Sequence, residues 1–248
     1  LKSIGKYAFA YSKIGNFTIP EKVEEIKYGC FNGAKKLNNI QIMEGNKVFK
    51  NYNNQFLLTK SDFNSSVFDV LLFIKQDVLK AIIPSFIKKI AKSSFSGCKN
   101  LIEFDFEKDS ECTLIDDSSF FFANFLKRFF IPRKVIEIGP CSFSGCKSLT
   151  KIYIEENSSL QIIENMAFHE SALESFSIPK KVIKIGYFAF SNCIHLKIVE
   201  INDESKLKVI NSNIFNRSPN VILMIPSNLK EKIMILKLMN FQTFIKII

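Results

Sequence analysis

IPRKVIEIGPCSFSGCKSLTKIYI (residues 131–154) and IPKKVIKIGYFAFSNCIHLKIVEI (residues 178–201) are two copies of one pattern, 47 residues apart. In both copies, apolar residues stand 3, 6, 11, 17, 20 and 22 positions after the proline. The same offsets follow two earlier prolines, so four copies begin, at Pro20, Pro84, Pro132 and Pro179. A fixed period of this kind is typical of a solenoid, in which each unit is covered by its neighbours.

Half-units of a second type lie between these copies and reduce the basic period to about 23 to 24 residues. The segment Leu-x-x-Ile-x-Ile alternates with period two, which predicts a short strand, and the proline that follows ends it. The next stretch, Ile-Gly-x-x-x-Phe-x-x-Cys, is expected to turn the chain back through a single helical turn with Phe pointing inward. We therefore predict an α/β solenoid of about nine turns. It would be a right-handed superhelix with a parallel sheet on the concave side and short helical turns on the convex side.

One interval breaks the period. From Pro20 to Pro84 is 64 residues, 17 more than 47. The extra residues fall at about 43–67, close to two apolar segments, FLLT (56–59) and VFDVLLF (67–73). These segments predict a hairpin inserted into the solenoid. The hairpin is either a tolerated insertion or a binding or dimerising element.

The repeat stops near the C-terminus. We assign residues 1–226 to the solenoid and residues 227–248 to a C-terminal cap. NLKE (228–231) resembles a helix capping box, and we expect a helix from there to about Leu238 and a last strand near residues 244–248. The chain opens in mid-pattern with LKSIGKYAF, so we expect a fragment whose N-terminus does not reveal the compartment.

The remaining sequence features argue against a catalytic, metal-binding or nucleic-acid-binding site. The net charge of +10 comes from basic residues spread along the chain, so we do not expect nucleic-acid binding. Cys98, Cys146 and Cys193 share one repeat offset, and we expect small buried packing residues there, because alternate turns lie about 10 Å apart, beyond disulfide reach. His169 and His195 have no ligand neighbours at metal spacing. We predict no catalytic residue, metal or cofactor. The C-terminal tail is interrupted too often by Lys and Glu to be a transmembrane segment.

The two quoted copies resemble the BspA-type leucine-rich repeat, related to the Treponema class, and the resemblance covers essentially the whole chain. It implies a leucine-rich-repeat solenoid. Members are surface or secreted proteins of bacteria and of protozoan parasites such as Trichomonas and Entamoeba, and are thought to act in adhesion. The Lys-, Asn- and Ile-rich composition suits a parasitic protist better than a bacterium.

The resemblance therefore implies a non-catalytic protein-binding module, cell-surface or secreted and adhesin-like, that contacts proteins of the host or of neighbouring cells. It carries no catalytic or binding residue over to this chain. An intracellular scaffold that binds a protein partner remains the alternative, and the ligand and the oligomeric state stay open.

In each Leu-x-x-Ile-x-Ile strand, the residues that flank the middle Ile point away from the core. We predict a partner-binding patch on the concave face from six such residues in the middle of the chain, Glu103, Asp105, Arg128, Phe130, Lys151 and Tyr153. Aromatic residues and Arg are the types enriched in binding hot spots. The alternative is a cross-strand ladder that only stabilises the sheet.

Overall fold

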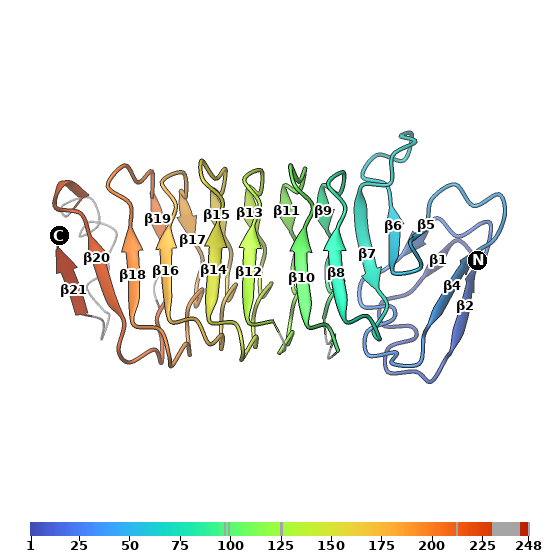
Figure 1. Ribbon diagram of the computed structural model, residues 1–248, viewed down its shortest axis with the longest axis horizontal. Coiled ribbons are helices and arrows are strands. Elements are labelled where there is room, and N and C mark those ends of the chain that lie inside the picture. Colours follow the sequence, from blue (N-terminus) through green and yellow to red (C-terminus); the bar gives the residue numbers. More distant parts are fainter. Residues whose placement is uncertain (97, 99, 125, 212, 230–243, 248) are drawn as a thin grey trace.

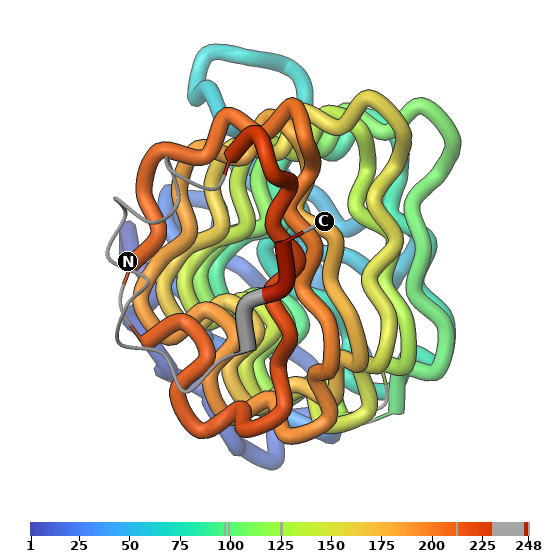
Figure 2. The backbone as a smooth tube through the Cα atoms, turned by 90° about the vertical axis from the view of Figure 1, so that its left-hand side faces the viewer, coloured from blue at the N-terminus to red at the C-terminus, as the bar shows by residue number. Residues whose placement is uncertain are grey.

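The chain is an elongated β-solenoid of about ten turns. The computed structural model describes residues 1–96, 98, 100–124, 126–211, 213–229 and 244–247. Successive turns are stacked along the long axis, with the N- and C-termini at opposite ends (Figure 1). Seen along that axis, the turns superimpose on one another as coils of similar outline (Figure 2). Most turns contribute one four-residue strand and one two-residue strand.

The Leu-x-x-Ile-x-Ile segments form the four-residue strands, and their outward side chains make up what we term the long-strand face. The strands are parallel, in four separate sheets: β2–β4, β8–β10, β12–β14 and β16–β18–β20–β21. Their bounds are β2 (Asn16–Ile19), β4 (Asn39–Ile42), β8 (Lys80–Ile83), β10 (Glu103–Phe106), β12 (Arg128–Ile131), β14 (Lys151–Ile154), β16 (Ser175–Ile178), β18 (Ile198–Ile201), β20 (Ile222–Ile225) and β21 (Phe244–Ile247). We expected one continuous sheet here, and the structure divides it.

A second sheet, which we did not predict, runs along the solenoid without a break from β7 (Val70–Ile74) to β19. It is built from the two-residue x-Ile segments that follow the prolines or occupy the equivalent position in the second type of half-unit. The short strands are β1 (Ser3–Ile4), β3 (Glu25–Ile26), β9 (Lys89–Ile90), β11 (Leu114–Ile115), β13 (Glu137–Ile138), β15 (Ile162–Ile163), β17 (Lys184–Ile185) and β19 (Val209–Ile210). β1 and β3 pair only with each other. The strands from β7 to β19 pair in parallel, which fixes the spacing of the turns.

The inserted segment adds two antiparallel strands, β5 (Lys50–Tyr52) and β6 (Phe56–Thr59), to the edge of this sheet beside β7. The loop between β6 and β7 projects from the body of the solenoid (Figures 1 and 2). Its base is held by the buried carboxylate of Asp69, which accepts hydrogen bonds from the backbone N–H (2.8 Å) and the hydroxyl (2.7 Å) of Ser61 and lies 3.2 Å from Lys88 Nζ. Desolvation raises the pKa of Asp69, but these hydrogen bonds and the Lys88 charge outweigh it and leave the pKa below its ordinary value.

The predicted helical turns are not confirmed: the segments around the repeat Phe residues form successive hydrogen-bonded β-turns. The reason is left-handed backbone two residues before and two residues after the Phe, as at Cys141 (φ 52°) and Gly145 (φ 73°) around Phe143. An α-helix cannot contain such residues, because every φ in it is negative. The Phe143 N–H instead donates to the carbonyl of Ala167 in the next turn, at 2.8 Å.

Helix is nearly absent from the part of the chain that the structure describes, which contains one 3₁₀ turn, η1 (Ser227–Leu229). Within those residues, no helix has the length and apolar character needed to cross a membrane. The helix predicted as far as Leu238 lies outside the described residues. The strand expected near 244–248 is β21, which pairs in parallel with β20.

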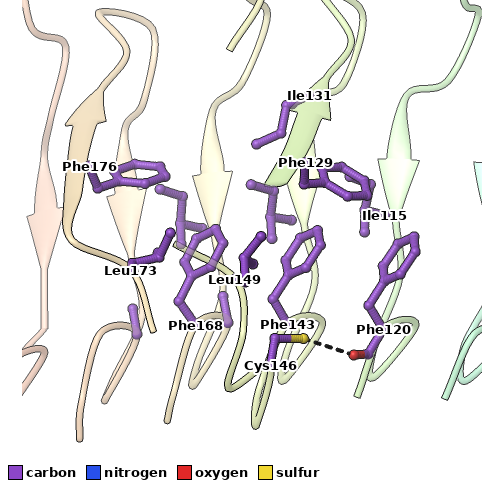
Figure 3. Packing of buried hydrophobic residues seen from close by; sticks show 14 of the residues in the cluster. Ile115, Phe120, Phe129, Ile131, Phe143, Cys146, Leu149, Phe168, Leu173 and Phe176 are labelled. Atoms are coloured by element: carbon purple, nitrogen blue, oxygen red, sulfur yellow. Dashed lines mark hydrogen bonds between the residues drawn. The ribbon is translucent and has the colours of Figure 1, made fainter. Parts of the chain in front are cut away.

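The main core is a column of phenylalanine rings, one from each turn. Phe120, Phe143 and Phe168 stack with centroid separations of 5.2 and 5.4 Å and nearly parallel planes (Figure 3). Phe129 of β12 lies edge-on to Phe143, with centroids 4.7 Å apart. All four rings are fully buried. The core therefore directly supports the strand that carries Arg128 and Phe130.

Candidate binding surface

The long-strand face is interrupted between β10 and β12. No ladder joins these strands, although β8 pairs with β10 and β12 pairs with β14. The interval from Glu103 to Arg128 is 25 positions, against 23 from Lys80 to Glu103 and 23 from Arg128 to Lys151. A groove of about 620 Å³ lies at this interruption, with walls that include Ile82, Glu103, Asp105, Lys127 and Arg128. We term the outward residues of β8, β10, β12 and β14, with this groove, the β8–β14 surface.

The structure places all six predicted residues on this surface and divides them into two groups. Glu103 and Asp105 lie on β10, on one side of the interruption. The other four lie beyond it, on β12 and β14, where Arg128 is directly opposite Lys151 and Phe130 is directly opposite Tyr153. All six side chains are exposed.

The two aromatic residues form a stacked pair on the outside of the sheet. The rings of Phe130 and Tyr153 are 4.6 Å apart with an angle of 12° between their planes, and both remain about two-fifths exposed, at 41% and 39%. Arg128 lies 6.0 Å from the ring centroid of Phe130, and Lys151 Nζ lies 5.9 Å from that of Tyr153. Each cation thus lies at the outer limit of a cation–π contact with the ring on its own strand.

The acidic side of the groove is already partly neutralised. Lys80 Nζ lies 2.9 Å from a carboxylate oxygen of Glu103. The hydrogen bond and charge of Lys80, and then the charge of Arg128 across the groove, lower the pKa of Glu103 below its ordinary value. Asp105 accepts a hydrogen bond from the N–H of Phe106 at 2.8 Å and forms no ion pair within the described residues.

Four further residues of this surface were missed in the sequence. Ile82 and Ile102 are large exposed apolar side chains that line the groove, Leu79 is exposed immediately before β8, and Lys127 is an exposed cation on the opposite wall. The signal that could have found them is the repeat length, because Glu103 and Arg128 are 25 positions apart in the sequence, against 23 for the equivalent positions of the units on either side. An exposed apolar cluster ringed by charge is typical of a protein-binding surface.

One arrangement elsewhere has the outline of a catalytic triad. His169 Nδ1 is 2.7 Å from the hydroxyl of Ser191, and His169 Nε2 is 3.4 Å from a carboxylate oxygen of Glu170. The Ser191 hydroxyl, however, donates to the carbonyl of Phe188 at 2.9 Å and is buried, so its proton is not directed at the imidazole. The group is best explained as a link between turns. In the part of the chain described, no cluster of three or more His, Cys, Asp or Glu side chains is placed to hold a metal ion.

All six cysteines are unpaired thiols, and those at the shared repeat offset are buried. Burial raises the pKa of the Cys98 and Cys146 thiols to about 12 and of the Cys193 thiol to about 11. Cys146 Sγ donates to the carbonyl of Phe120 at 3.1 Å (Figure 3), and Cys193 Sγ donates to that of Phe168 at 3.0 Å. These thiols pack and hydrogen-bond between turns and are poor nucleophiles.

Comparison with known proteins locates the repeat within a family. The family described as BspA type leucine rich repeat region matches residues 2–109, 71–171 and 161–234, in six copies. The crystal structure of the pneumococcal vaccine antigen PcpA is similar over 100% of this chain and 60% of that chain, with a TM-score of 0.64 and 18% identity. A leucine-rich repeat protein from Eubacterium ventriosum is similar over 87% of this chain and 59% of that chain, with a TM-score of 0.62 and 20% identity. The chain thus spans about three-fifths of the length of these structures, and no curated protein matches it.

Proposed function

Because this chain belongs to the BspA-type leucine-rich repeat family, we propose that it is a non-catalytic protein-binding module that uses the β8–β14 surface. The observation that carries the proposal is the groove between β10 and β12, lined by exposed Ile82, Ile102 and Arg128, together with the exposed Phe130–Tyr153 stack on the adjoining β12–β14 pair. Stacked aromatic rings next to an Arg, on the same face as a recess that an incoming side chain can fill, are features of a binding hot spot. We assign this surface to the concave side of the solenoid.

We further propose a cell-surface or secreted, adhesin-like role in contact with proteins of the host or of neighbouring cells. The family membership and the similarity to a pneumococcal vaccine antigen support this location, because a vaccine antigen has to be accessible to antibodies. The Lys-, Asn- and Ile-rich composition is our reason to propose a parasitic protist as the source, although the two similar structures described above are bacterial. Antibody labelling of intact and of permeabilised source cells tests the location. Labelling only after permeabilisation would contradict it.

Photo-crosslinking tests the binding surface. A benzophenone amino acid at Phe130 should crosslink a protein partner in an extract of the contacted cells. The matched control is the same label at Ile136, which is 40% exposed, against 41% for Phe130, but lies beside the short strand β13. We expect defined crosslinked bands from position 130 and none from position 136. Equal crosslinking from the two positions would refute a specific role for the β8–β14 surface.

The second candidate is an intracellular scaffold that binds a protein partner through the same surface. The six unpaired cysteines favour it, because thiols stay reduced in the cytosol while extracellular proteins more often pair them. The labelling experiment separates the two, since a scaffold is labelled only in permeabilised cells.

A further inference from the structure

Arg128 and Lys151 form an unusual pair on the β8–β14 surface. They are directly opposite each other in the β12–β14 register, both are exposed, and neither forms an ion pair within the described residues. Like charges directly opposite each other destabilise a sheet. The equivalent positions of the neighbouring pair carry opposite charges, Lys80 and Glu103, which are 2.9 Å apart. The β12–β14 pair thus retains an unfavourable contact that a single acidic residue would remove.

The two cations also lie next to a pair of stacked aromatic rings. Each is near the aromatic ring of its own strand, and those rings stack on each other at 4.6 Å. Both charges therefore lie side by side next to the stacked rings, and within the described residues neither side chain donates a hydrogen bond to a protein acceptor. An anion that bridges them would convert their mutual repulsion into two charge-assisted hydrogen bonds.

We propose that Arg128 and Lys151 are an anion-binding pair that takes an aspartate or glutamate side chain of a protein partner. This inference rests on the proposed function and specifies the chemistry of the partner. A carboxylate offers two oxygens, which suits one guanidinium and one ammonium held side by side.

The surroundings of the pair select a carboxylate on a protein over a polyanion. On one flank Lys127 adds a third cation, but across the groove lie the carboxylates of Glu103 and Asp105. A nucleic acid or sulfated glycan running along the solenoid would meet these carboxylates and be repelled. Exposed Ile82 and Ile102 line the same groove and can contact an apolar side chain. The partner segment therefore carries an acidic residue close to an aliphatic or aromatic one.

The test uses the full 248-residue chain and a random-peptide phage library, followed by fluorescence anisotropy with the enriched peptides. Peptides selected on the native protein should share an Asp or Glu beside an apolar residue. Lys151→Glu removes the anion-binding pair while giving Arg128 an opposite-charge neighbour, so this variant should fold with an unchanged or higher urea midpoint. It should nevertheless weaken peptide binding by about tenfold or more. The matched control is Lys197→Glu, the same charge change at an exposed lysine beside β18, which should alter affinity by less than about twofold.

The outcomes separate the two proposals. If Phe130→Ala abolishes peptide binding while Lys151→Glu leaves it within about twofold, the binding surface stands and the anion-binding pair is refuted. If neither variant changes the binding of any enriched peptide, the proposed function fails as well. Heparin and single-stranded DNA serve as polyanion probes. Tighter binding of either one than of the peptides, lost in Lys151→Glu, would overturn the assignment of a protein carboxylate.

Discussion

Replacing Phe143 by Ala tests the link between the phenylalanine column and the binding surface. Phe143 is fully buried, stacks on Phe120 and Phe168 at 5.2 and 5.4 Å, and meets Phe129 edge-on at 4.7 Å. Truncating a buried Phe to Ala costs about 3–5 kcal/mol, because the apolar contacts are lost and a cavity remains. Three ring partners place this site at the upper end, since each aromatic pair contributes about 0.5–1.5 kcal/mol beyond its buried area. We therefore expect a loss of about 4–5 kcal/mol.

The matched control is Phe130→Ala, the same substitution at a ring that is 41% exposed and has one stacking partner. Solvent fills the space that the ring leaves, so only the transfer and stacking contributions are lost, about 1–2 kcal/mol. Urea unfolding followed by far-UV circular dichroism gives both values. A solenoid can unfold in sections, so hydrogen exchange of the β12 and β14 amides is measured alongside.

In Phe143→Ala these amides should exchange faster than those of β2 and β4, which lie on the other side of the hairpin insertion from β12 and β14. A loss below about 2 kcal/mol, or one equal to that of Phe130→Ala, would refute the assignment of the column as the core that supports the surface.

Three further predictions concern the turns, the inserted loop and the thiols. Gly145→Ala should destabilise the protein by about 1–2 kcal/mol because Ala adopts the left-handed conformation poorly, and by a further amount because the added Cβ would lie 2.6 Å from the Phe122 ring and displace it. In the Phe122→Ala variant the ring is gone, so adding Gly145→Ala should cost only the backbone contribution. Thermal unfolding measures both effects. The pKa of Asp69 is lowered in the folded state, so its stabilisation is complete above the unfolded pKa of about 4 and is lost as pH falls through the folded pKa. Asp69→Asn should accordingly destabilise the protein at neutral pH and lose that effect in acid, and a pH-independent difference in the urea midpoint would contradict this. Burial raises the pKa of the Cys146 thiol to about 12, so iodoacetamide should alkylate it only after unfolding, as read by mass spectrometry.

The repeat could be identified from the sequence because its core positions carry chemically similar residues in every copy. Val135, Ile138, Phe143 and Leu149 stand at four of the shared apolar offsets, and all four are fully buried, including the Phe that was predicted to point inward. The reason is that each stacked turn must present the same apolar residues at the same place, which the sequence displays directly. The predicted strand over residues 151–154 is β14, with the alternation expected of it.

The backbone conformation of the turns could not be predicted in the same way. An apolar residue every few positions with a Gly nearby suits a helical turn as well as a series of β-turns, and the choice is made by backbone angles. The positions two before and two after the Phe adopt positive φ whether they are Gly, as at Gly29 and Gly33, or Tyr, as at Tyr7 and Tyr11. Glycines at such positions indicate left-handed backbone, but tyrosines there conceal it.

The groove was not predicted because it depends on a small difference in length between successive repeat units, and a search for a regular period disregards such differences. The half-unit between β10 and β12 is two residues longer than its neighbours. Length alone does not decide the pairing, however, since β18 and β20 pair across 24 positions while β14 and β16 are separated by the same number and do not. Whether the outer strands pair therefore depends on how the longer turns pack.

The inner layers remain continuous beneath the groove, and this makes the surface suited to binding without rearrangement. Below the missing ladder, Phe104 of β10 stacks on Phe129 of β12, with centroids 5.0 Å apart. In the second sheet, β9 and β11 of the same turns pair in register. The two walls of the groove are thus fixed by contacts that no ligand has to form. Since little order has to be created on binding, the side chains that border the opening can contribute most of their interaction energy to affinity.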